Sequence, residues 1–121
     1  MYEILITIYI DESLFKEIGI RKRKDFGFEL RAACSDTAHI PLFNVGVQWI
    51  TLQDTQNVPK ITFDVEVRTE QSAGLRKLNS SLALQISSAV MESPSIPSGT
   101  KYHVVTYAGG RCWQFTKESS A

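Results

Sequence analysis

Two stretches of strict alternation constrain this chain more than any other feature of its sequence. In an extended strand, successive side chains point to opposite faces, so an apolar residue at every second position indicates a strand with one buried face. The first stretch, residues 2–10, carries Ile4, Ile6, Ile8 and Ile10. The second, residues 60–68, carries Ile61, Phe63, Val65 and Val67, alternating with Thr62, Asp64, Glu66 and Arg68. Both stretches therefore predict β-strands.

A different spacing follows in two other segments. Apolar residues three or four positions apart lie on one side of an α-helix. This spacing predicts a long helix over residues 70–91, capped by Thr69, with the stripe Leu75, Leu78, Leu82, Ile86 and Val90. A shorter helix is predicted after Asp11, whose carboxylate can accept from a backbone N–H one turn later. Gly19 suits the end of that helix.

Four further strands are predicted from shorter patterns. Residues 26–34 alternate Phe26, Phe28, Leu30, Ala32 and Cys34. Residues 45–53 are apolar on both sides, which favours a central strand or a bulge near Gly46. Their short connection to residues 60–68 favours an antiparallel hairpin. Residues 102–107 and 111–116 form a last hairpin across Gly109-Gly110, since paired glycines suit two-residue turns with positive φ.

The element order predicted in this way is β-α-β-β-β-α-β-β. Only one helical crossover between strands appears in it, which argues against a doubly wound fold. The sequence therefore predicts an α+β fold, a mostly antiparallel sheet with one long and one short helix packed on one face. The 121 residues fit one domain, expected over residues 1–116, followed by a flexible polar tail at 117–121.

Charge and hydropathy narrow the classes of function. Thirteen basic and thirteen acidic side chains cancel, and binding to nucleic acid depends on neutralising phosphates with Lys and Arg. The one dense basic cluster, Arg21–Lys24, is followed by Asp25 and Glu29. Nucleic-acid binding through Arg21–Lys24 is kept as a second alternative. No targeting segment or membrane-length apolar run is found, so a cytoplasmic location without membrane association is expected.

Two cysteines and two histidines, Cys34, His39, His103 and Cys112, invite a zinc or thiol interpretation. The spacing does not match a zinc finger. The expected hairpin register pairs Tyr107 with Cys112 and His103 with Thr116, which keeps His103 away from Cys112. Phosphate-binding loops are absent too. The sequence therefore predicts neither a metal nor a cofactor, with Cys34 and Cys112 as reduced thiols, although Cys34 and His39 could meet across the 35–44 loop.

Helices on one face would leave the other face of the sheet open. Mixed charge with Tyr and Arg suits a protein-binding surface, because a few aromatic and Arg residues often dominate binding energy. The predicted binding residues on this face are Tyr9, Arg31, Asp64, Glu66, Arg68, His103 and Tyr107.

The function predicted on this basis is a non-catalytic protein-binding module that occludes a protein partner. Small neutral α+β domains without catalytic motifs include inhibitors such as immunity or antitoxin-like proteins. An alternative is a small enzyme or ligand-binding domain that uses Cys/His or the paired carboxylates Asp64 and Glu66 in a cleft. The sequence does not indicate the oligomeric state.

Overall fold

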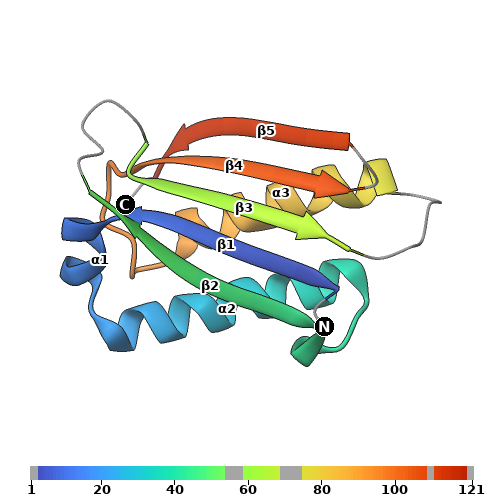
Figure 1. The fold of residues 1–121 in the computed structure, drawn as a ribbon, viewed down its shortest axis with the longest axis horizontal. Helices are drawn as coiled ribbons and strands as arrows, with labels where there is room; N and C mark the ends of the chain where they lie inside the picture. Colours follow the sequence, from blue (N-terminus) through green and yellow to red (C-terminus); the bar gives the residue numbers. More distant parts are fainter. Residues whose placement is uncertain (1–2, 54–58, 69–74, 109–110, 120–121) are drawn as a thin grey trace.

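A five-stranded sheet carries two long helices on one face, in a computed structural model that describes residues 3–53, 59–68, 75–108 and 111–119 (Figure 1). The strands are β1 (Ile4–Asp11), β2 (Val45–Leu52), β3 (Ile61–Val67), β4 (Lys101–Ala108) and β5 (Arg111–Glu118). The helices are α1 (Glu12–Ile18), α2 (Ile20–Ala38) and α3 (Leu75–Glu92), with a 3-10 turn, η1 (Leu42–Asn44), before β2. None of the helices in the described part of the chain is both long and apolar enough to cross a membrane.

The sheet is mixed, so the prediction of a mostly antiparallel sheet is wrong. Its strand order is β2-β1-β3-β4-β5. β1 runs parallel to β2, and β3 runs parallel to β4. The β1–β3 and β4–β5 pairs are antiparallel. Parallel neighbours need a crossover, and here α1 and α2 supply one while α3 supplies the other. The chain thus contains two β-α-β units where the sequence predicted a single helical crossover.

The error originates in residues 26–34, which were predicted as a strand and form part of α2. Phe26, Leu30 and Cys34 lie four residues apart and are fully buried. Phe28 belongs to the alternating pattern but not to the helical one, and 56% of it is exposed. In an alternating run, every second apolar residue is four positions from the next, which is also a helical spacing. This segment therefore matches both patterns. A predicted β-strand is therefore the middle of a 19-residue helix.

The position of β2 also differs from the prediction. It lies at one edge of the sheet and not in a central position. It forms no hairpin with β3, because β1 lies between the two strands. The apolar residues on both sides of this strand include Ile50 and Leu52, which are 39% and 40% exposed on the face away from the helices.

Several local predictions agree with the structure. The Asp11 carboxylate accepts from the backbone N–H of Leu14 at 3.2 Å, and Gly19 ends α1 with a φ of 83°. The β4–β5 register pairs Tyr107 with Cys112 and His103 with Thr116. The expected start of the long helix, residues 69–74, lies outside the described residues.

The described end of the chain is bonded to the loop before β4. β5 continues through Lys117 and Glu118, two residues that the sequence assigned to the tail. The next residue, Ser119, is buried, and its backbone N–H donates to the carbonyl of Thr100 at 2.8 Å. Its hydroxyl donates to the carbonyl of Pro97 at 2.7 Å. These bonds fasten the last described residue to the loop before β4.

The core lies between the sheet and the two long helices. The four isoleucines of β1 are 0–1% exposed, and Leu82, Ile86 and Val90 of α3 are equally buried. An aromatic series crosses the same layer. The ring centroid of Phe26 lies 6.4 Å from that of Trp49 and 6.0 Å from that of Phe63, which lies 6.2 Å from Tyr102. Tyr102 then shares a buried 2.8 Å hydrogen bond with Ser87 of α3. These rings join α2 in one β-α-β unit to β3 and β4 in the other.

Alanine substitutions at Phe26 and Phe28 distinguish the helix from the predicted strand. A strand would bury both rings on one face. In α2, Phe26→Ala should cost about 3–5 kcal/mol of unfolding free energy, because it empties a packed site. Phe28→Ala should change it by about 0.5 kcal/mol or less. Urea unfolding of the two variants measures both values, and equal losses would contradict the helical assignment.

Candidate active site

A small pocket opens at the end of the sheet where β1 begins and β3 ends. Its volume is about 240 Å³. Its walls come from both β-α-β units, and the residues that line it are Glu3, Ile4, Ala38, His39, Ile40, Val67 and Leu78. Ile4 and Val67 are buried core residues, so the floor of the pocket is apolar. The polar side chains among these are Glu3 and His39.

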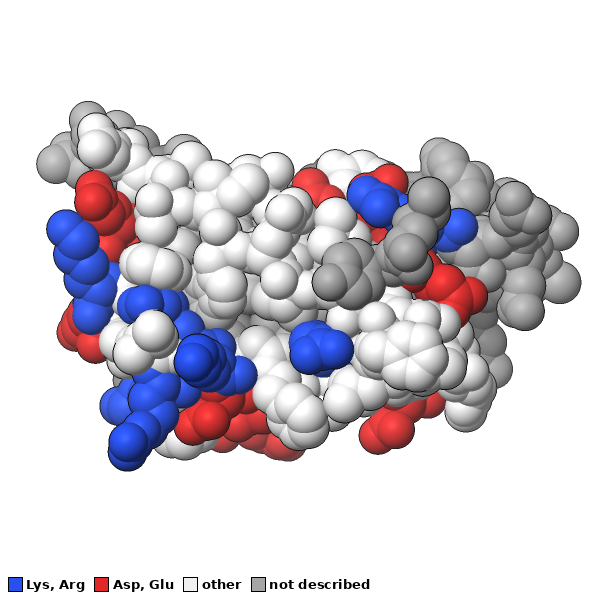
Figure 2. Space-filling model, turned by 60° about the horizontal axis from the view of Figure 1, so that its bottom comes forward, with Lys and Arg blue, Asp and Glu red and all other residues white. Residues whose placement is uncertain are grey.

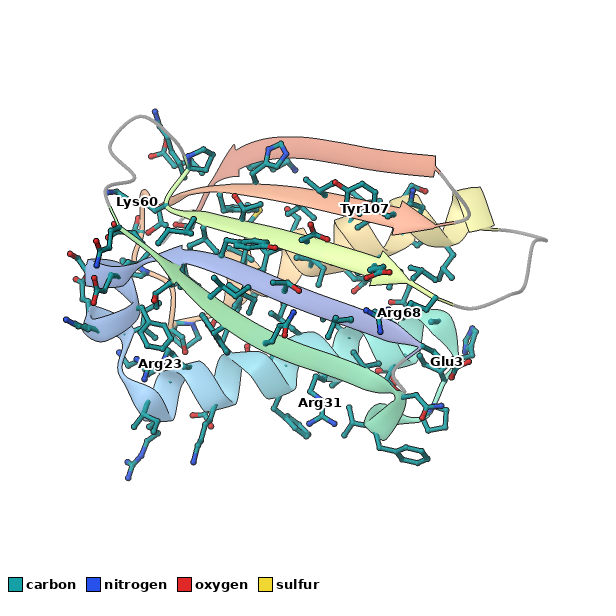
Figure 3. All side chains as sticks on the ribbon, in the orientation of Figure 1. Glu3, Arg23, Arg31, Lys60, Arg68 and Tyr107 are labelled. Carbon is teal, nitrogen blue, oxygen red and sulfur yellow. The ribbon has the colours of Figure 1, made fainter. Side chains whose placement is uncertain are left out.

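Glu3 is held in place by its backbone and by its carboxylate. Its N–H donates to the carbonyl of Asn44 at 2.9 Å, and its carbonyl accepts from the N–H of Arg68 at 2.7 Å. The side-chain amide of Asn44 donates to Glu3 Oε2 at 2.7 Å. Figure 3 shows Glu3 and Arg68 at the same end of the sheet. The carboxylate thus has a fixed position beside the pocket, because one of its oxygens is tied to η1.

His39 takes its position from the end of α2. It is the C-cap residue, with φ 56° and ψ 45°, and it is the one non-glycine residue with positive φ in the described chain. Its backbone N–H and that of Ile40 both bond to the carbonyl of Ser35, and the Ser35 hydroxyl donates to the carbonyl of Ile40. A left-handed residue commonly ends a helix, and these hydrogen bonds fix the backbone of His39 at the end of α2.

The arrangement combines a carboxylate, an imidazole and an apolar floor. Carboxylates and histidines are the usual general acids and bases of enzymes, and a pocket of this size suits a ligand smaller than a drug molecule. No sequence pattern indicates a role for Glu3, and the sequence predicts His39 in a loop with Cys34 as its possible partner. No sequence signal joins positions 3 and 39, because their proximity depends on the β1–α2–β2 crossover.

The thiol alternative is not supported by the environment of Cys34. This cysteine is free, belongs to α2 and is fully buried. Burial raises the pKa of its thiol to about 12, so the nucleophilic thiolate is almost absent at neutral pH. Within the described residues, no group of three or more His, Cys, Asp and Glu side chains could hold a metal ion.

Six of the seven predicted binding residues belong to strands or follow them directly. Alternation and strand register place them on the sheet face opposite the helices, and they are Tyr9, Asp64, Glu66, Arg68, His103 and Tyr107. Arg31 does not belong with them, because it lies on α2. Its guanidinium donates to the carbonyls of Val45 at 2.9 Å and Leu42 at 3.3 Å, which fastens α2 to the start of β2.

The open face of the sheet carries two carboxylates, one of which is partly buried. Burial raises the pKa of Asp64 above its ordinary value of 3.8, and the charge of Glu66 raises it further. Asp64 is paired with Thr7 on β1 and Val105 on β4, whose side chains are 7% and 8% exposed. Glu66 instead forms an exposed ion pair with Arg68 at 3.1 Å. The two carboxylates are therefore in different surroundings.

Comparison with known proteins shows what the fold resembles. No protein-family model matches the chain, and no curated protein matches it. Solved structures do match, and they share a tautomerase-like fold. N1, a member of the cis-3-chloroacrylic acid dehalogenase family, has a TM-score of 0.62 and 19% identity, over 85% of this chain and 71% of its own.

Two further solved structures extend the comparison. A macrophage migration inhibitory factor-like protein from Entamoeba histolytica has a TM-score of 0.58 and 15% identity, over 87% of each chain. The symmetric trimer of wild-type Q0 fused 4-OT has a TM-score of 0.60 and 15% identity, over 85% of this chain and 83% of its own. Identities this low establish likeness of fold.

These neighbours overturn the function predicted from the sequence. They belong to the tautomerase superfamily, which includes enzymes such as the dehalogenases of the N1 family. A non-catalytic protein-binding module, whether an inhibitor, an immunity protein or an antitoxin-like protein, does not fit this set. The prediction that the chain is not an enzyme is likewise wrong. It rested on the absence of linear motifs, and the terminal pocket is built from residues that form no motif.

Asp64→Asn tests the electrostatics of the open face. Because the folded carboxyl has a raised pKa, it binds its proton more tightly than the unfolded chain does. Folding stability therefore falls as the pH rises from 3.8 through the raised value, and the loss persists at neutral pH. Asp64→Asn should be more stable than the unmodified chain at about pH 7 and similar to it at about pH 3.

Urea unfolding at the two pH values measures this difference. Asp36→Asn, at an exposed position of α2, is the matched control and should show a smaller difference between the two pH values. The raised pKa of Asp64 would be contradicted if Asp64→Asn and the unmodified chain differed in stability by the same amount at both pH values.

Proposed function

We propose that this chain is a small enzyme that moves a proton on a small carbonyl-bearing organic acid, with Glu3 and His39 as its acid–base pair. The observation that carries the proposal is the pocket in which these two side chains meet an apolar floor. The C-cap hydrogen bonds to the Ser35 carbonyl support it, because they give the backbone of His39 a defined position at the pocket. The dehalogenase family of N1 acts on a small unsaturated acid, which agrees with the limited volume.

The reaction follows from the two groups. The Glu3 carboxylate accepts a proton from the carbon beside the substrate carbonyl, and the electron pair of the broken C–H bond forms a C=C bond. Negative charge then develops on the carbonyl oxygen, where a ring N–H of His39 donates a hydrogen bond. Return of the proton from Glu3 to a different carbon or to the oxygen gives the isomer or the enol. Asn44 keeps the carboxylate oriented through its 2.7 Å bond.

Hydrogen–deuterium exchange tests the proton-transfer step directly. With 2-oxobutanoate in D₂O, the protein should accelerate the loss of the proton signal at the carbon beside the ketone, followed by NMR. Glu3→Gln should slow this exchange by about a hundredfold to ten-thousandfold, because the amide cannot accept the proton while its oxygen can still bond Asn44. His39→Asn should also slow it, since asparagine tolerates the left-handed conformation.

Matched variants separate catalysis from folding. Glu17→Gln and Glu29→Gln make the same change as Glu3→Gln at exposed positions of α1 and α2 outside the pocket, and both should leave the exchange rate unchanged. Equal rates in Glu3→Gln and the unmodified chain, with both proteins folded, would remove Glu3 as the base.

We further propose that the chain assembles as a homotrimer through the open face of the sheet. The Q0 fused 4-OT neighbour is described as a symmetric trimer. The open face exposes Ile50 and Leu52 on the edge strand β2 and Tyr107 on β4, each by 39–42%, and exposed large apolar side chains favour burial against another surface. The predicted binding residues Tyr9, Asp64, Glu66, Arg68, His103 and Tyr107 would then contact a second copy of the chain.

Sedimentation equilibrium tests the assembly. The unmodified protein should sediment at three times the 13.6 kDa of one chain. Ile50→Arg should release monomers, because it places a charge within the proposed interface. Leu84→Arg is the control, since Leu84 is 59% exposed on α3 in the helical layer. A monomeric unmodified chain, or equal dissociation by both variants, would contradict the proposed interface.

A further inference from the structure

A second hollow lies between α2 and the edge strand β2, away from the terminal pocket. We name it the α2 groove, and its volume is about 490 Å³. Ile20, Lys24, Gly27, Phe28 and Arg31 line it at helical spacing along one side of α2. Arg23 also comes from α2, Phe15 from α1, and Val47 and Trp49 from β2. Figure 3 shows Arg23 at the far end of the molecule from Glu3, so the two hollows are separate.

The charged side chains that line the α2 groove are all basic among the described residues. Arg23, Lys24 and Arg31 line it, and none of the described residues that do so is acidic. Asp25 and Glu29 also belong to α2 but do not line the groove. Figure 2 shows Lys and Arg side chains gathered where α1 meets α2, with Asp and Glu side chains at their margin and uncharged surface beside them. A neutral chain has thus concentrated three of its cations on one small concave surface, which attracts an anion.

Two of these cations are held before any ligand arrives. The Arg23 guanidinium lies 3.6 Å from the centroid of the Phe15 ring and donates to the Phe15 carbonyl. Arg31 is fixed by its bonds to the carbonyls of Val45 and Leu42. Lys24 is exposed on the same side of α2. Groups that are already ordered lose less entropy when they bind a ligand, so this cluster is prepared for an anionic partner.

The walls of the groove are aromatic. Phe28 is 56% exposed and Ile20 is 66% exposed, although both are large apolar residues. The Phe15 and Trp49 rings meet edge-on with centroids 5.9 Å apart. Exposed aromatic side chains beside cations favour a ligand with a flat apolar body and an anionic end.

Gly27 gives the groove its floor. Glycine in the middle of a helix destabilises it relative to alanine. An added Cβ here would have Val47 Cγ1 as its nearest contact, at an ordinary distance of 3.8 Å. Packing therefore does not require glycine at this position. A side chain would instead project toward space that the groove leaves open.

We propose that the α2 groove is a binding site for an aryl carboxylate. The carboxylate lies against Lys24 and Arg23, and the aromatic body lies between Phe28 and Trp49 over Gly27. This site is independent of the terminal pocket, so it serves as an accessory site and does not use Glu3 or His39.

Naphthalene-2-carboxylate is a suitable probe, and its neutral carboxamide is the control of equal shape. Isothermal titration calorimetry should give a dissociation constant of about 1 mM or tighter for the carboxylate. The carboxamide should bind about tenfold more weakly or worse, because a charge-assisted contact is lost. Lys24→Met should weaken the carboxylate by a similar factor, whereas Lys22→Met, in the same basic cluster but outside the groove, should not.

The walls and the floor have their own variants. Phe28→Ala should weaken binding, and Phe43→Ala, at another exposed phenylalanine outside the groove, should not. Gly27→Ala should raise the urea midpoint while it weakens the probe, a combination that a purely structural role for Gly27 would not produce. Glu3→Gln should leave the binding of the probe unchanged, which separates this test from that of the terminal pocket.

The outcomes are decisive in both directions. Equal binding of carboxylate and carboxamide would overturn the proposal. So would equal losses in Lys22→Met and Lys24→Met, since diffuse charge alone would then explain the affinity. No binding up to about 10 mM would overturn it as well, because a ligand of this size in a formed groove binds more tightly than that.

Discussion

The parallel pairing of β1 with β2, and of β3 with β4, is the constraint from which the rest of the structure follows. A parallel neighbour cannot be reached by a tight turn, so the chain must cross one face of the sheet between the two strands. α1 and α2 make the first crossing and α3 makes the second. Both crossings lie on the same face, where α2 and α3 pack against each other and bury the apolar side of the sheet (Figure 1).

That arrangement distributes the functional surfaces. The crossing of α2 returns the chain to the start of β1, which places His39 beside Glu3. The same helix lies along β2 and forms the groove between them. The face without helices retains polar and charged side chains together with Ile50, Leu52 and Tyr107. One topological requirement therefore produces a terminal pocket, a lateral groove and an open sheet.

The amino-acid sequence was sufficient to predict the strands that have one buried face and one open face. β1 and β3 show clean alternation, because helices cover one side and the other side is open. It also predicted the Asp11 cap and the β4–β5 register, which depend on local chemistry. It failed at Phe26–Cys34, where alternating and helical spacing coincide. That single misassignment removed one of the two crossovers, and with it the parallel pairing of β1 with β2. The candidate site could not be predicted, because Glu3 and His39 are joined only by that crossover.

The terminal pocket lies across the junction between the two β-α-β units. Glu3, Ile4 and His39 belong to the first unit, and Val67 and Leu78 belong to the second. Strands β1 and β3 are the sole sheet contact between the units in the described residues, and the 2.7 Å bond from the Arg68 N–H to the Glu3 carbonyl extends their ladder to the pocket rim. Any sliding of one unit past the other would change the pocket width at once. The rigidity of this antiparallel ladder therefore sets how large a molecule the pocket can admit.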